Sequence, residues 1–334
     1  ITEGTELTGV NVLATGAING RSVALVAANA SAAITSLLNV DGGATLTATG
    51  TNGAVVLATA NTGAITMPTN GAGIDADGAL IASGTSGDVI VAGSDAVSLG
   101  GEVFAGDDYT AVGTAVTLGG FATTAEQAAD GSVSITSTAA PITLAGNVNL
   151  TALVSGTLTG GVAGGGKNLS LDFPNTTAID GAAYTGIGNL STGGGGTTTL
   201  TGALTTSGSQ TFGDNVFLVG GTTLSGTDVS FVGDVDGSQN LAVNASGATT
   251  FGGAVGDFVA LASLTTDAAG STALDGELVL TSGAQSYGDP VTLGADTLLI
   301  STGAQTIGFG GALDGAHDLT VVTGGVSRFG GVVG

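Results

Sequence analysis

A segment of sequence near the C-terminus of this chain occurs more than once. Gly208-Ser-Gln-Thr-Phe-Gly-Asp-Asn-Val-Phe-Leu218 returns 75 positions later as Gly283-Ala-Gln-Ser-Tyr-Gly-Asp-Pro-Val-Thr-Leu293. Phe251-Gly-Gly-Ala-Val-Gly256 returns with an offset of 78 as Phe329-Gly-Gly-Val-Val-Gly334. Similarity at a fixed period indicates a stacked architecture in which each repeat contacts its neighbours. This feature constrains the fold more than any local motif in the chain.

An earlier and more divergent copy extends the pattern. Lys167-Asn-Leu169 aligns with Gln239-Asn-Leu241 and with His317-Asp-Leu319, and Thr177-Ala-Ile-Asp-Gly-Ala182 aligns with Thr249-Thr-Phe-Gly-Gly-Ala254. We therefore predict two regions in one stack. Residues 1–159 form irregular coils, and residues 160–334 continue the stack with repeats at about 160–207, 208–282 and 283–334.

The composition predicts an all-β protein. The chain has 334 residues, of which 63 are Gly, only 4 are Pro and 9% are charged, while 42% are hydrophobic. Disordered chains combine low hydrophobicity with high charge density, so disorder is disfavoured. Collagen is excluded because there is no strict Gly-X-Y period and almost no Pro.

Short strands are predicted along most of the chain. The apolar-x-apolar pattern of a strand with one buried face recurs between Gly, Asp, Ser and Asn residues. With three such strands in each turn, a repeat of about 75 residues makes three or four turns. We predict a parallel β-helix, or β-solenoid, built as a single elongated stack; a sandwich or a closed barrel is the alternative fold. The triplets are Val89–Val91, Val97–Leu99, Tyr109–Ala111, Val116–Leu118, Val133–Ile135, Ile142–Leu144, Val216–Leu218, Thr222–Leu224, Val229–Phe231, Leu241–Val243, Thr249–Phe251, Thr272–Leu274 and Leu278–Leu280.

The corners and one insertion can also be predicted. Asp-Gly steps are expected to supply corners with positive φ, because Gly has no Cβ to oppose that conformation. The segment Thr123–Ala129 is the best helix candidate but lacks an apolar stripe, so a loop bulging from the stack is expected near residues 121–131. The Asp-Gly steps begin at Asp130, Asp180, Asp236, Asp275 and Asp314.

The charge limits the partners. Three basic residues, Arg21, Lys167 and Arg328, stand against 26 acidic ones, which gives a net charge of −23. Nucleic acids and anionic lipid surfaces need a basic stripe, so neither is an expected partner. No apolar run is long enough to span a membrane, so membrane insertion is not expected. The chain starts at Ile1 and stops inside a repeat, so we expect a segment of a longer, processed protein.

Catalytic constellations are weak in this sequence. Paired carboxylates can hydrolyse glycosides, and Asp75/Asp77, Asp107/Asp108 and Asp234/Asp236 are the candidate pairs. Each pair lies in a Gly-rich turn, where Asp also serves to cap backbone.

The basic residues do not recur between copies. Lys167 aligns with Gln239 and His317, and Arg328 aligns with Thr250 and Ala178. Since His317 is the single histidine, a His-based metal site or a Ser-His-Asp triad is not expected. The prediction is therefore a protein without enzymatic activity and without catalytic, cofactor or metal residues.

Two motifs suggest other ligands. Asn70-Gly-Ala-Gly-Ile-Asp75 matches part of the calcium-binding nonapeptide of β-rolls, but it occurs once, so regular Ca²⁺ binding is not expected, and an ion at a turn stays open. Thr45-Leu-Thr-Ala-Thr49 and Thr197-Thr-Thr-Leu-Thr201 resemble the Thr-x-Thr faces of ice-binding solenoids. Because Thr-x-Thr does not recur in every turn, the β-propensity of Thr is sufficient to explain it.

The repeats resemble those of a known group of proteins. The segments Leu241–Gly256 and Ser282–Leu293 are similar to repeats of filamentous-haemagglutinin-like bacterial adhesins, including two-partner-secretion passengers, and Gly87–Val91 and Leu99–Val103 are similar in style. The resemblance covers residues 160–334 best. It implies a right-handed parallel β-helix, export to the cell surface, and a shaft that displays adhesive parts located elsewhere.

The expected function is therefore a structural shaft of a secreted or cell-surface bacterial adhesin or matrix fibre. Its expected partners are further copies of itself, end to end or side by side, and host or matrix glycans or receptors. The alternatives are a carbohydrate-binding or polysaccharide-degrading β-helix protein and an ice-binding solenoid.

Overall fold

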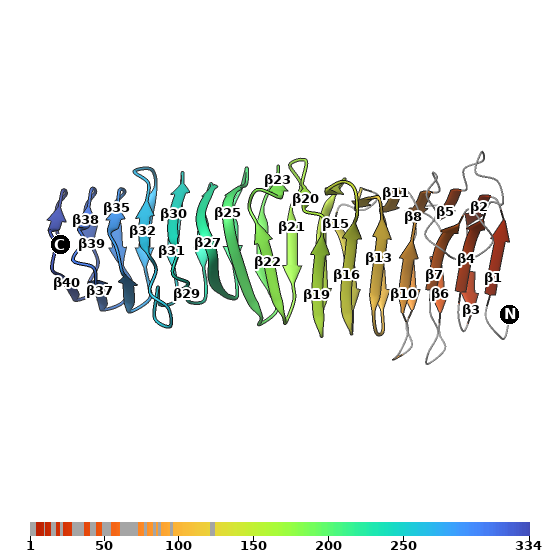
Figure 1. The fold of residues 1–334 in the computed structure, drawn as a ribbon, viewed down its shortest axis with the longest axis horizontal. Helices are drawn as coiled ribbons and strands as arrows, with labels where there is room; N and C mark the ends of the chain where they lie inside the picture. Colours follow the sequence, from red (N-terminus) through yellow and green to blue (C-terminus); the bar gives the residue numbers. More distant parts are fainter. Residues whose placement is uncertain are drawn as a thin grey trace. The chain divides into compact units, whose positions relative to one another are not determined.

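The computed structural model is built from short parallel strands. It describes residues 5–9, 11–14, 18–20, 23–28, 37–40, 45–48, 55–60, 73–76, 79–82, 85, 88–93, 96–120 and 124–334. Over these residues there is no helix, and every strand pairing is parallel. The chain divides into two compact units, Ile1–Asn175 and Thr176–Gly334. Figure 1 shows the strands of each unit lying side by side.

The first unit has three parallel sheets, and successive strands of the chain enter them in rotation. One sheet has the order β1 (Thr5–Gly9), β4 (Val23–Ala28), β7 (Val55–Ala60), β10 (Val89–Ala92), β13 (Tyr109–Gly113), β16 (Ser132–Ser137) and β19 (Ser155–Thr159). The second follows β2 (Asn11–Ala14), β5 (Leu37–Val40), β8 (Gly73–Ala76), β11 (Ala96–Leu99), β14 (Ala115–Leu118), β17 (Ile142–Leu144) and β20 (Val162–Ala163). The third follows β3 (Ile18–Gly20), β6 (Thr45–Ala48), β9 (Ala79–Ala82), β12 (Val103–Ala105), β15 (Thr124–Ala129), β18 (Asn147–Ala152) and β21 (Leu169–Asp172).

The second unit also has three walls, which the chain visits in a fixed order. The first wall contains β22 (Thr176–Asp180), the first parts of β25 (Thr197–Thr205) and β27 (Asn215–Gly226), β29 (Val235–Asp236), the bridge residue Val255, β34 (Leu278–Thr281), β37 (Thr297–Ser301) and β40 (Leu319–Thr323). The second wall contains the later parts of β25 and β27, then β30 (Asn240–Ala245), β32 (Ser263–Thr266), β35 (Gln285–Tyr287), β38 (Ile307–Phe309) and β41 (Ser327–Phe329).

The third wall contains β24 (Leu190–Gly193), β26 (Gln210–Phe212), β28 (Val229–Phe231), β31 (Ala248–Phe251), β33 (Ser271–Leu274), β36 (Val291–Leu293) and β39 (Leu313–Asp314). The short strand β23 (Tyr184–Thr185) lies between β22 and β24 in the chain. One turn of the second unit thus consists of a first-wall, a second-wall and a third-wall strand.

Side chains alternate between the interior and the surface, as period-2 strands require. In β36, Val291 and Leu293 are buried and Thr292 is exposed, and β16 alternates in the same way along its length. All thirteen apolar-x-apolar triplets quoted above lie within strands. The predicted β-solenoid is confirmed, and parallel pairing throughout the described residues excludes the antiparallel sandwich or barrel.

Aromatic side chains form two stacked columns inside the second unit. On the third wall, Phe231 stacks between Phe212 and Phe251, with ring centroids 5.3 and 5.1 Å away. On the second wall, Phe309 stacks between Tyr287 and Phe329, at 5.1 and 5.3 Å. These spacings follow from the distance between paired strands, which is about 4.8 Å. Equivalent positions in successive turns therefore place large rings face to face.

The two columns are copies of each other, yet they lie on different walls. Phe212 on the third wall corresponds to Tyr287 on the second wall in the later copy of the block. Between Phe212 and Tyr287 the chain advances by eleven wall positions. Since each turn has three walls, eleven positions are one short of four full turns. Each copy is consequently displaced by one wall. The eleven wall positions that follow Phe212 are Val216, Leu224, Phe231, Val235, Val243, Phe251, Val255, Leu264, Leu274, Val279 and Tyr287 itself.

Other pairs of corresponding residues are displaced by one wall in the same direction. Phe251 lies on the third wall and its counterpart Phe329 on the second. Leu241 lies on the second wall and its counterpart Leu319 on the first. The repeat therefore makes three and two-thirds turns, which agrees with the predicted three or four.

Apart from two glycines, the residues shared by the two copies are the buried ones. Gln, an aromatic residue, Asp, Val and Leu recur at the inward positions of the block. Their exposed fractions are at most 6% in either copy. The outward positions differ, and Phe217, for instance, becomes Thr292. What the repeat preserves is thus a set of core side chains that fits any of the three walls. The inward pairs are Gln210/Gln285, Phe212/Tyr287, Asp214/Asp289, Val216/Val291 and Leu218/Leu293.

One local prediction was wrong, and a second was confirmed only in part. The loop expected near residues 121–131 contains strand β15, which pairs with β12 and, along its whole length, with β18. Ala125 and Ala129 are buried there, because small apolar residues at every second position fit the interior of a paired strand.

Among the predicted Asp-Gly corners, positive φ occurs at Gly237 (116°) and Gly315 (127°). At Gly181 and Gly276 the reason for glycine is different. A Cβ there would overlap the backbone of Ala203 or of Gly253 in a neighbouring turn. Close approach of stacked turns, and not the sign of φ, requires glycine at these two positions.

Candidate functional site

The paired carboxylates proposed from sequence hold backbone in place. Asp108 Oδ1 accepts the Ser132 N–H at 2.8 Å, and Asp234 Oδ1 accepts the Ala254 N–H at 2.8 Å. Each donor lies one turn further along the stack, so these side chains cap the next turn and not their own. A carboxylate oxygen satisfies an amide that has no strand partner at the corner. The pair Asp75/Asp77 lies outside the residues whose side chains are described.

The same contact recurs at other corners, with Asn as well as Asp. Asn189 accepts the Ser209 N–H, and Asp228 accepts the Ala248 N–H, both at 2.8 Å. Because Asn serves as well as Asp, the negative charge is not required for this role. The described contacts of Asp108 and Asp234 are therefore those of backbone caps.

The rare cationic side chains are dispersed. Lys167 is exposed in a turn closed by its own N–H and the Gly164 carbonyl, at 2.9 Å. His317 Nδ1 lies 3.3 Å from Asp296 Oδ1 at the surface. The Asp296 carboxylate also accepts the Asp318 N–H, and this bond and the His317 contact lower its pKa. Arg21 lies outside the described residues.

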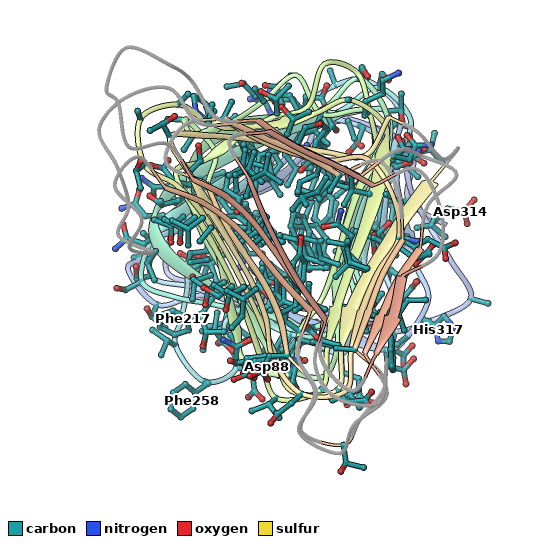
Figure 2. The ribbon with its side chains drawn as sticks, turned by 90° about the vertical axis from the view of Figure 1, so that its right-hand side faces the viewer. Asp88, Phe217, Phe258, Asp314 and His317 are labelled. Carbon is teal, nitrogen blue, oxygen red and sulfur yellow. The ribbon has the colours of Figure 1, made fainter. Side chains whose placement is uncertain are left out.

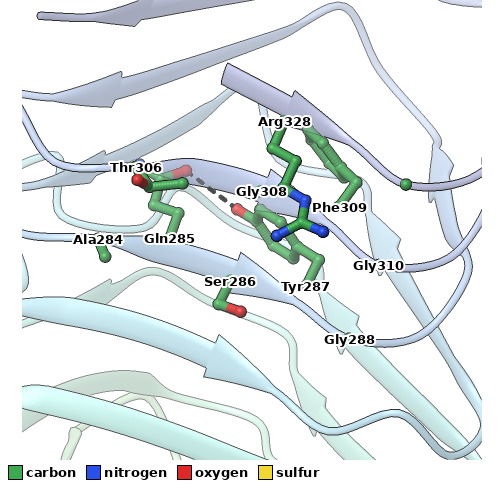
Figure 3. A pocket seen from close by; sticks show the side chains of 11 residues that line it. Ala284, Gln285, Ser286, Tyr287, Gly288, Thr306, Gly308, Phe309, Gly310 and Arg328 are labelled. Atoms are coloured by element: carbon green, nitrogen blue, oxygen red, sulfur yellow. Dashed lines mark hydrogen bonds between the residues drawn. The ribbon is translucent and has the colours of Figure 1, made fainter. Parts of the chain in front are cut away.

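The outer surface of the second wall carries a groove of about 580 Å³ (Figure 3). Its floor is a column of outward residues in three successive turns, Ser286, Gly308 and Arg328. A Cβ at Gly308 would meet only the side chains of Thr306 and Arg328, at 3.7 and 3.9 Å, so packing does not demand glycine there. The missing side chain leaves an open floor beneath the Arg328 guanidinium.

The chemistry available in this groove is limited. Among the described carboxylates, none forms an ion pair with Arg328. A guanidinium binds a carboxylate through paired hydrogen bonds, and the Ser286 hydroxyl can add one more. The groove can thus hold a small anion, but no described acid or base stands beside Arg328 to support catalysis. The sequence showed only that Arg328 does not recur between copies, and the groove was not detected because Gly308 gives no signal without its neighbours.

A buried glutamine recurs at one corner of both copies. Gln285 Nε2 is directed at the Val279 carbonyl (3.1 Å), the Thr281 hydroxyl (3.3 Å) and the Ile300 carbonyl (2.8 Å). In the earlier copy, Gln210 Nε2 is directed at the three corresponding residues, which are Leu204, Thr206 and Ser225. In both copies the amide nitrogen of the glutamine is paired within the corner, and paired buried polar groups favour a single packing arrangement. This network is a structural device and not a ligand site.

Asp289 is the most enclosed carboxylate described in the second unit, with 1% of its surface exposed. Its oxygens accept hydrogen bonds from the hydroxyls of Thr266 (3.0 Å) and Thr272 (2.8 Å). Desolvation raises the pKa of Asp289, although the two threonine bonds oppose the shift. No described cation compensates this carboxyl, so its charge is a cost to the fold.

The structure describes the Thr-x-Thr segment at Thr197–Thr201 and only part of the other two ligand-like segments. The outward neighbours of Thr197 and Thr199 in the next turn are Asn215 and Phe217, so this Thr-x-Thr row does not continue. Residues 70–72 of the calcium-like motif and the side chains of Thr45–Thr49 lie outside the described part. Within the described part, no group of three or more His, Cys, Asp or Glu residues could hold a metal ion.

Comparison with known proteins adds no relative: no protein-family model, curated protein or solved structure matches the chain. The described residues contain no helix long and apolar enough to cross a membrane. By its fold the chain is a β-solenoid, and its function has to be argued from its own residues.

Proposed function

We propose that this chain is a structural shaft segment of a secreted or cell-surface bacterial adhesin or extracellular matrix fibre. The observation that carries the proposal is the nature of the repeat. The inward residues recur, the outward ones change, and each copy is displaced by one wall. Such a repeat maintains a stack but does not repeat a binding or catalytic face. A shaft needs a continuous stack and does not need a repeated binding or catalytic face.

The internal contacts favour a stiff element within each unit. Parallel strands pair from turn to turn, aromatic rings stack, and buried glutamines and Asx side chains hold the corners. Each such hydrogen bond contributes about 1 kcal/mol, and the contributions accumulate along the stack. Bending the stack would break several contacts at once.

The acidic composition supports a location outside the cell. A net charge of −23 on a chain with only 9% charged residues comes almost entirely from acidic groups. Such a charge keeps a Gly-rich surface in solution. This argument and the resemblance to exported adhesins both support secretion, which fractionation of the native host would test.

The shaft role is tested by the form of the isolated protein. Stacked turns present unpaired strand edges at their ends, and these edges can add to one another. We expect rods or fibres in negative-stain electron microscopy as the concentration rises. Monodisperse monomers at high concentration would overturn self-assembly. Release of reducing sugar or unsaturated uronate from a polysaccharide panel would overturn the non-enzymatic role, and inhibition of ice recrystallisation would favour the ice-binding alternative.

A second candidate is binding of a carboxylated sugar, and the Arg328 groove is the observation that favours it. Its test is a glycan array with the wild-type chain and Arg328→Gln. Loss of binding to uronate- or sialate-bearing glycans in the variant alone would support this function. Equal binding by both proteins would show that the groove is not the binding site of the sugar.

A further inference from the structure

Over its last three strands, the outer face of the first wall differs from the other two walls. On the second and third walls, the outward residues of the paired strands are mostly small or polar, such as Thr223, Ala242, Ser286, Thr250 and Thr292. On the first wall, strands β34, β37 and β40 present aliphatic side chains at all outward positions but one. These are Leu278 and Leu298 in one column, which Thr320 continues, and Leu280, Ile300 and Val322 in the next, with Val322 50% exposed.

The internal repeat provides a control for this asymmetry. In the earlier copy, the counterparts of Leu280, Leu298 and Ile300 are Thr205, Thr223 and Ser225 on the second wall. In the other direction, Phe217 on the first wall has Thr292 on the third wall as its counterpart. In each of these pairs the apolar outward residue lies on the first wall and its polar counterpart on another wall. The apolar character is therefore not inherited with the repeat. It is confined to part of the first wall, since β22 and β25 carry Thr176, Thr197 and Thr199 at outward positions there.

An exposed aromatic residue extends the same face. Between Val255 and Leu261 the first wall opens into a short loop, and Gly256 has a φ of 76° at its start. Asp236 Oδ1 accepts the N–H groups of Phe258 (2.9 Å) and Val259 (2.8 Å), which holds the loop on the wall. The Phe258 side chain is 86% exposed. Figure 2 shows Phe217 and Phe258 projecting outward on the same side of the second unit.

Acidic groups border this apolar face. Glu277, Asp296 and Asp318 stand directly before β34, β37 and β40, and all three are exposed. His317 contacts Asp296 and is the one basic group among them. A second copy of the chain would bring another acidic border and a net charge of −23 against this one. A cationic partner would be attracted by the same acidic groups. Apolar patches on a protein surface mark sites at which a partner binds.

We propose that this first-wall face, made of Leu278, Leu280, Leu298, Ile300, Val322 and Phe258, is a docking surface for a basic amphipathic polypeptide segment. Apolar side chains of the partner pack on the two aliphatic columns and on Phe258. Its Lys or Arg residues meet Glu277, Asp296 and Asp318. The proposal is independent of the shaft role, because it concerns one face and not assembly along the stack.

The test uses the full chain and a fluorescein-labelled synthetic peptide of alternating Leu and Lys, with a Leu–Glu peptide as the charge control. Fluorescence anisotropy is measured against increasing protein. We expect saturable binding of the Leu–Lys peptide and none of the Leu–Glu peptide. The variant Leu280→Thr/Leu298→Thr/Ile300→Ser installs the residues found in the second-wall copies and is expected to bind at least about tenfold more weakly.

Two controls separate the face from general effects. Ala242→Thr/Ala273→Thr changes outward positions on the other two walls and is expected to bind the peptide like the wild type. If the triple variant does not fold, Phe258→Ser replaces it, since an 86% exposed side chain contributes little to stability. A loss of about threefold or more is expected from that single change.

Three outcomes overturn the proposal. The first is equal affinity of the wild type and the face variants for the Leu–Lys peptide. The second is equal binding of the Leu–Glu peptide. The third is a wild-type dimer in sedimentation equilibrium that the triple variant abolishes and the peptide does not displace, which would assign the face to a second copy.

Discussion

The Tyr287 hydroxyl donates a hydrogen bond to Oε1 of Gln285 at 3.2 Å, inside the second unit where both side chains are fully buried. In the earlier copy of this corner the ring is Phe212, which has no hydroxyl, and Oε1 of Gln210 is buried without a partner. The same corner therefore exists once with a complete hydrogen-bond network and once with an orphan acceptor. An unpaired buried acceptor costs about 1 to 3 kcal/mol.

This difference predicts opposite effects of two reciprocal substitutions. Tyr287→Phe is expected to lower the free energy of unfolding by about 1 to 2 kcal/mol, because it leaves Gln285 Oε1 without a donor. Phe212→Tyr is expected to preserve or raise the stability, since the new hydroxyl can reach Gln210. Urea unfolding followed by circular dichroism measures both. A loss of equal size in the two variants would show that the packing around each ring, and not the hydrogen bond to glutamine, controls the corner.

A second prediction concerns glycines that separate stacked turns. Gly276→Ala is expected to destabilise the fold by roughly 2 kcal/mol, because the new Cβ would overlap the Gly253 carbonyl of the neighbouring turn. Gly221→Ala is the matched control, since nothing lies within 4 Å of a Cβ there. It is expected to change the stability by no more than about 0.5 kcal/mol. Thermal unfolding of the two variants measures the difference in stability. Similar losses of stability in both would count against steric exclusion at Gly276.

The third prediction is a pH dependence. Because burial raises the pKa of Asp289, the folded chain binds this proton more tightly than the unfolded chain does. The Asp289 contribution is therefore greatest below the ordinary carboxyl pKa of 3.8 and is lost as the pH rises through the raised value. Asp289→Asn is expected to remove this decline, so its stability relative to wild type improves from pH 3 to pH 7. Urea midpoints across that range provide the measurement.

Asp296 supplies the control of opposite sign. The Asp318 N–H and His317 lower the pKa of its exposed carboxylate, so its contribution is present above the ordinary pKa and is lost as the pH falls. In Asp296→Asn, stability relative to wild type should improve toward acid pH, if it changes at all. If both variants shift in the same direction, the raised pKa of Asp289 is not the cause.

The fourth prediction tests whether the three walls are interchangeable. Deletion of residues 210–284 joins Ser209 to Gln285 and puts Gln285–Tyr287 at the third-wall position that Gln210–Phe212 occupied. Every later strand then moves by one wall while its buried residues stay inward. We expect a folded, shorter solenoid with an undiminished β signal per residue, and a smaller denaturant m-value because less surface is buried.

Deletion of residues 210–285 is the control for this experiment. It removes one further residue and would turn the inward side chains of the following strand outward. It is expected to unfold at much lower urea concentration. Equal stability of the two deletions would refute a repeat of eleven strands.

Much of the fold could be predicted from local pattern. Alternating triplets such as Val116–Leu118 require one buried face, and the return of the Gly208–Leu218 block requires stacking, so strands and solenoid followed directly. Thr124–Ala129 could not be assigned correctly, because alternating alanines give too weak an apolar signal to reveal a paired strand. The Asp-Gly steps were recognised as corners, but the need for glycine at Gly276 depends on a backbone from another turn.

The amino-acid pattern is enough to show that this chain repeats a set of core residues, because burial imposes the same chemistry on every copy. The wall that each copy occupies is seen only in the folded chain, because it depends on how many strands complete a turn. With three strands in a turn and eleven in a repeat, identical motifs lie on different walls, and the outer surface is free to differ. The first-wall face with Phe258 and the groove below Arg328 arise from this freedom, and neither can be detected from spacing along the chain.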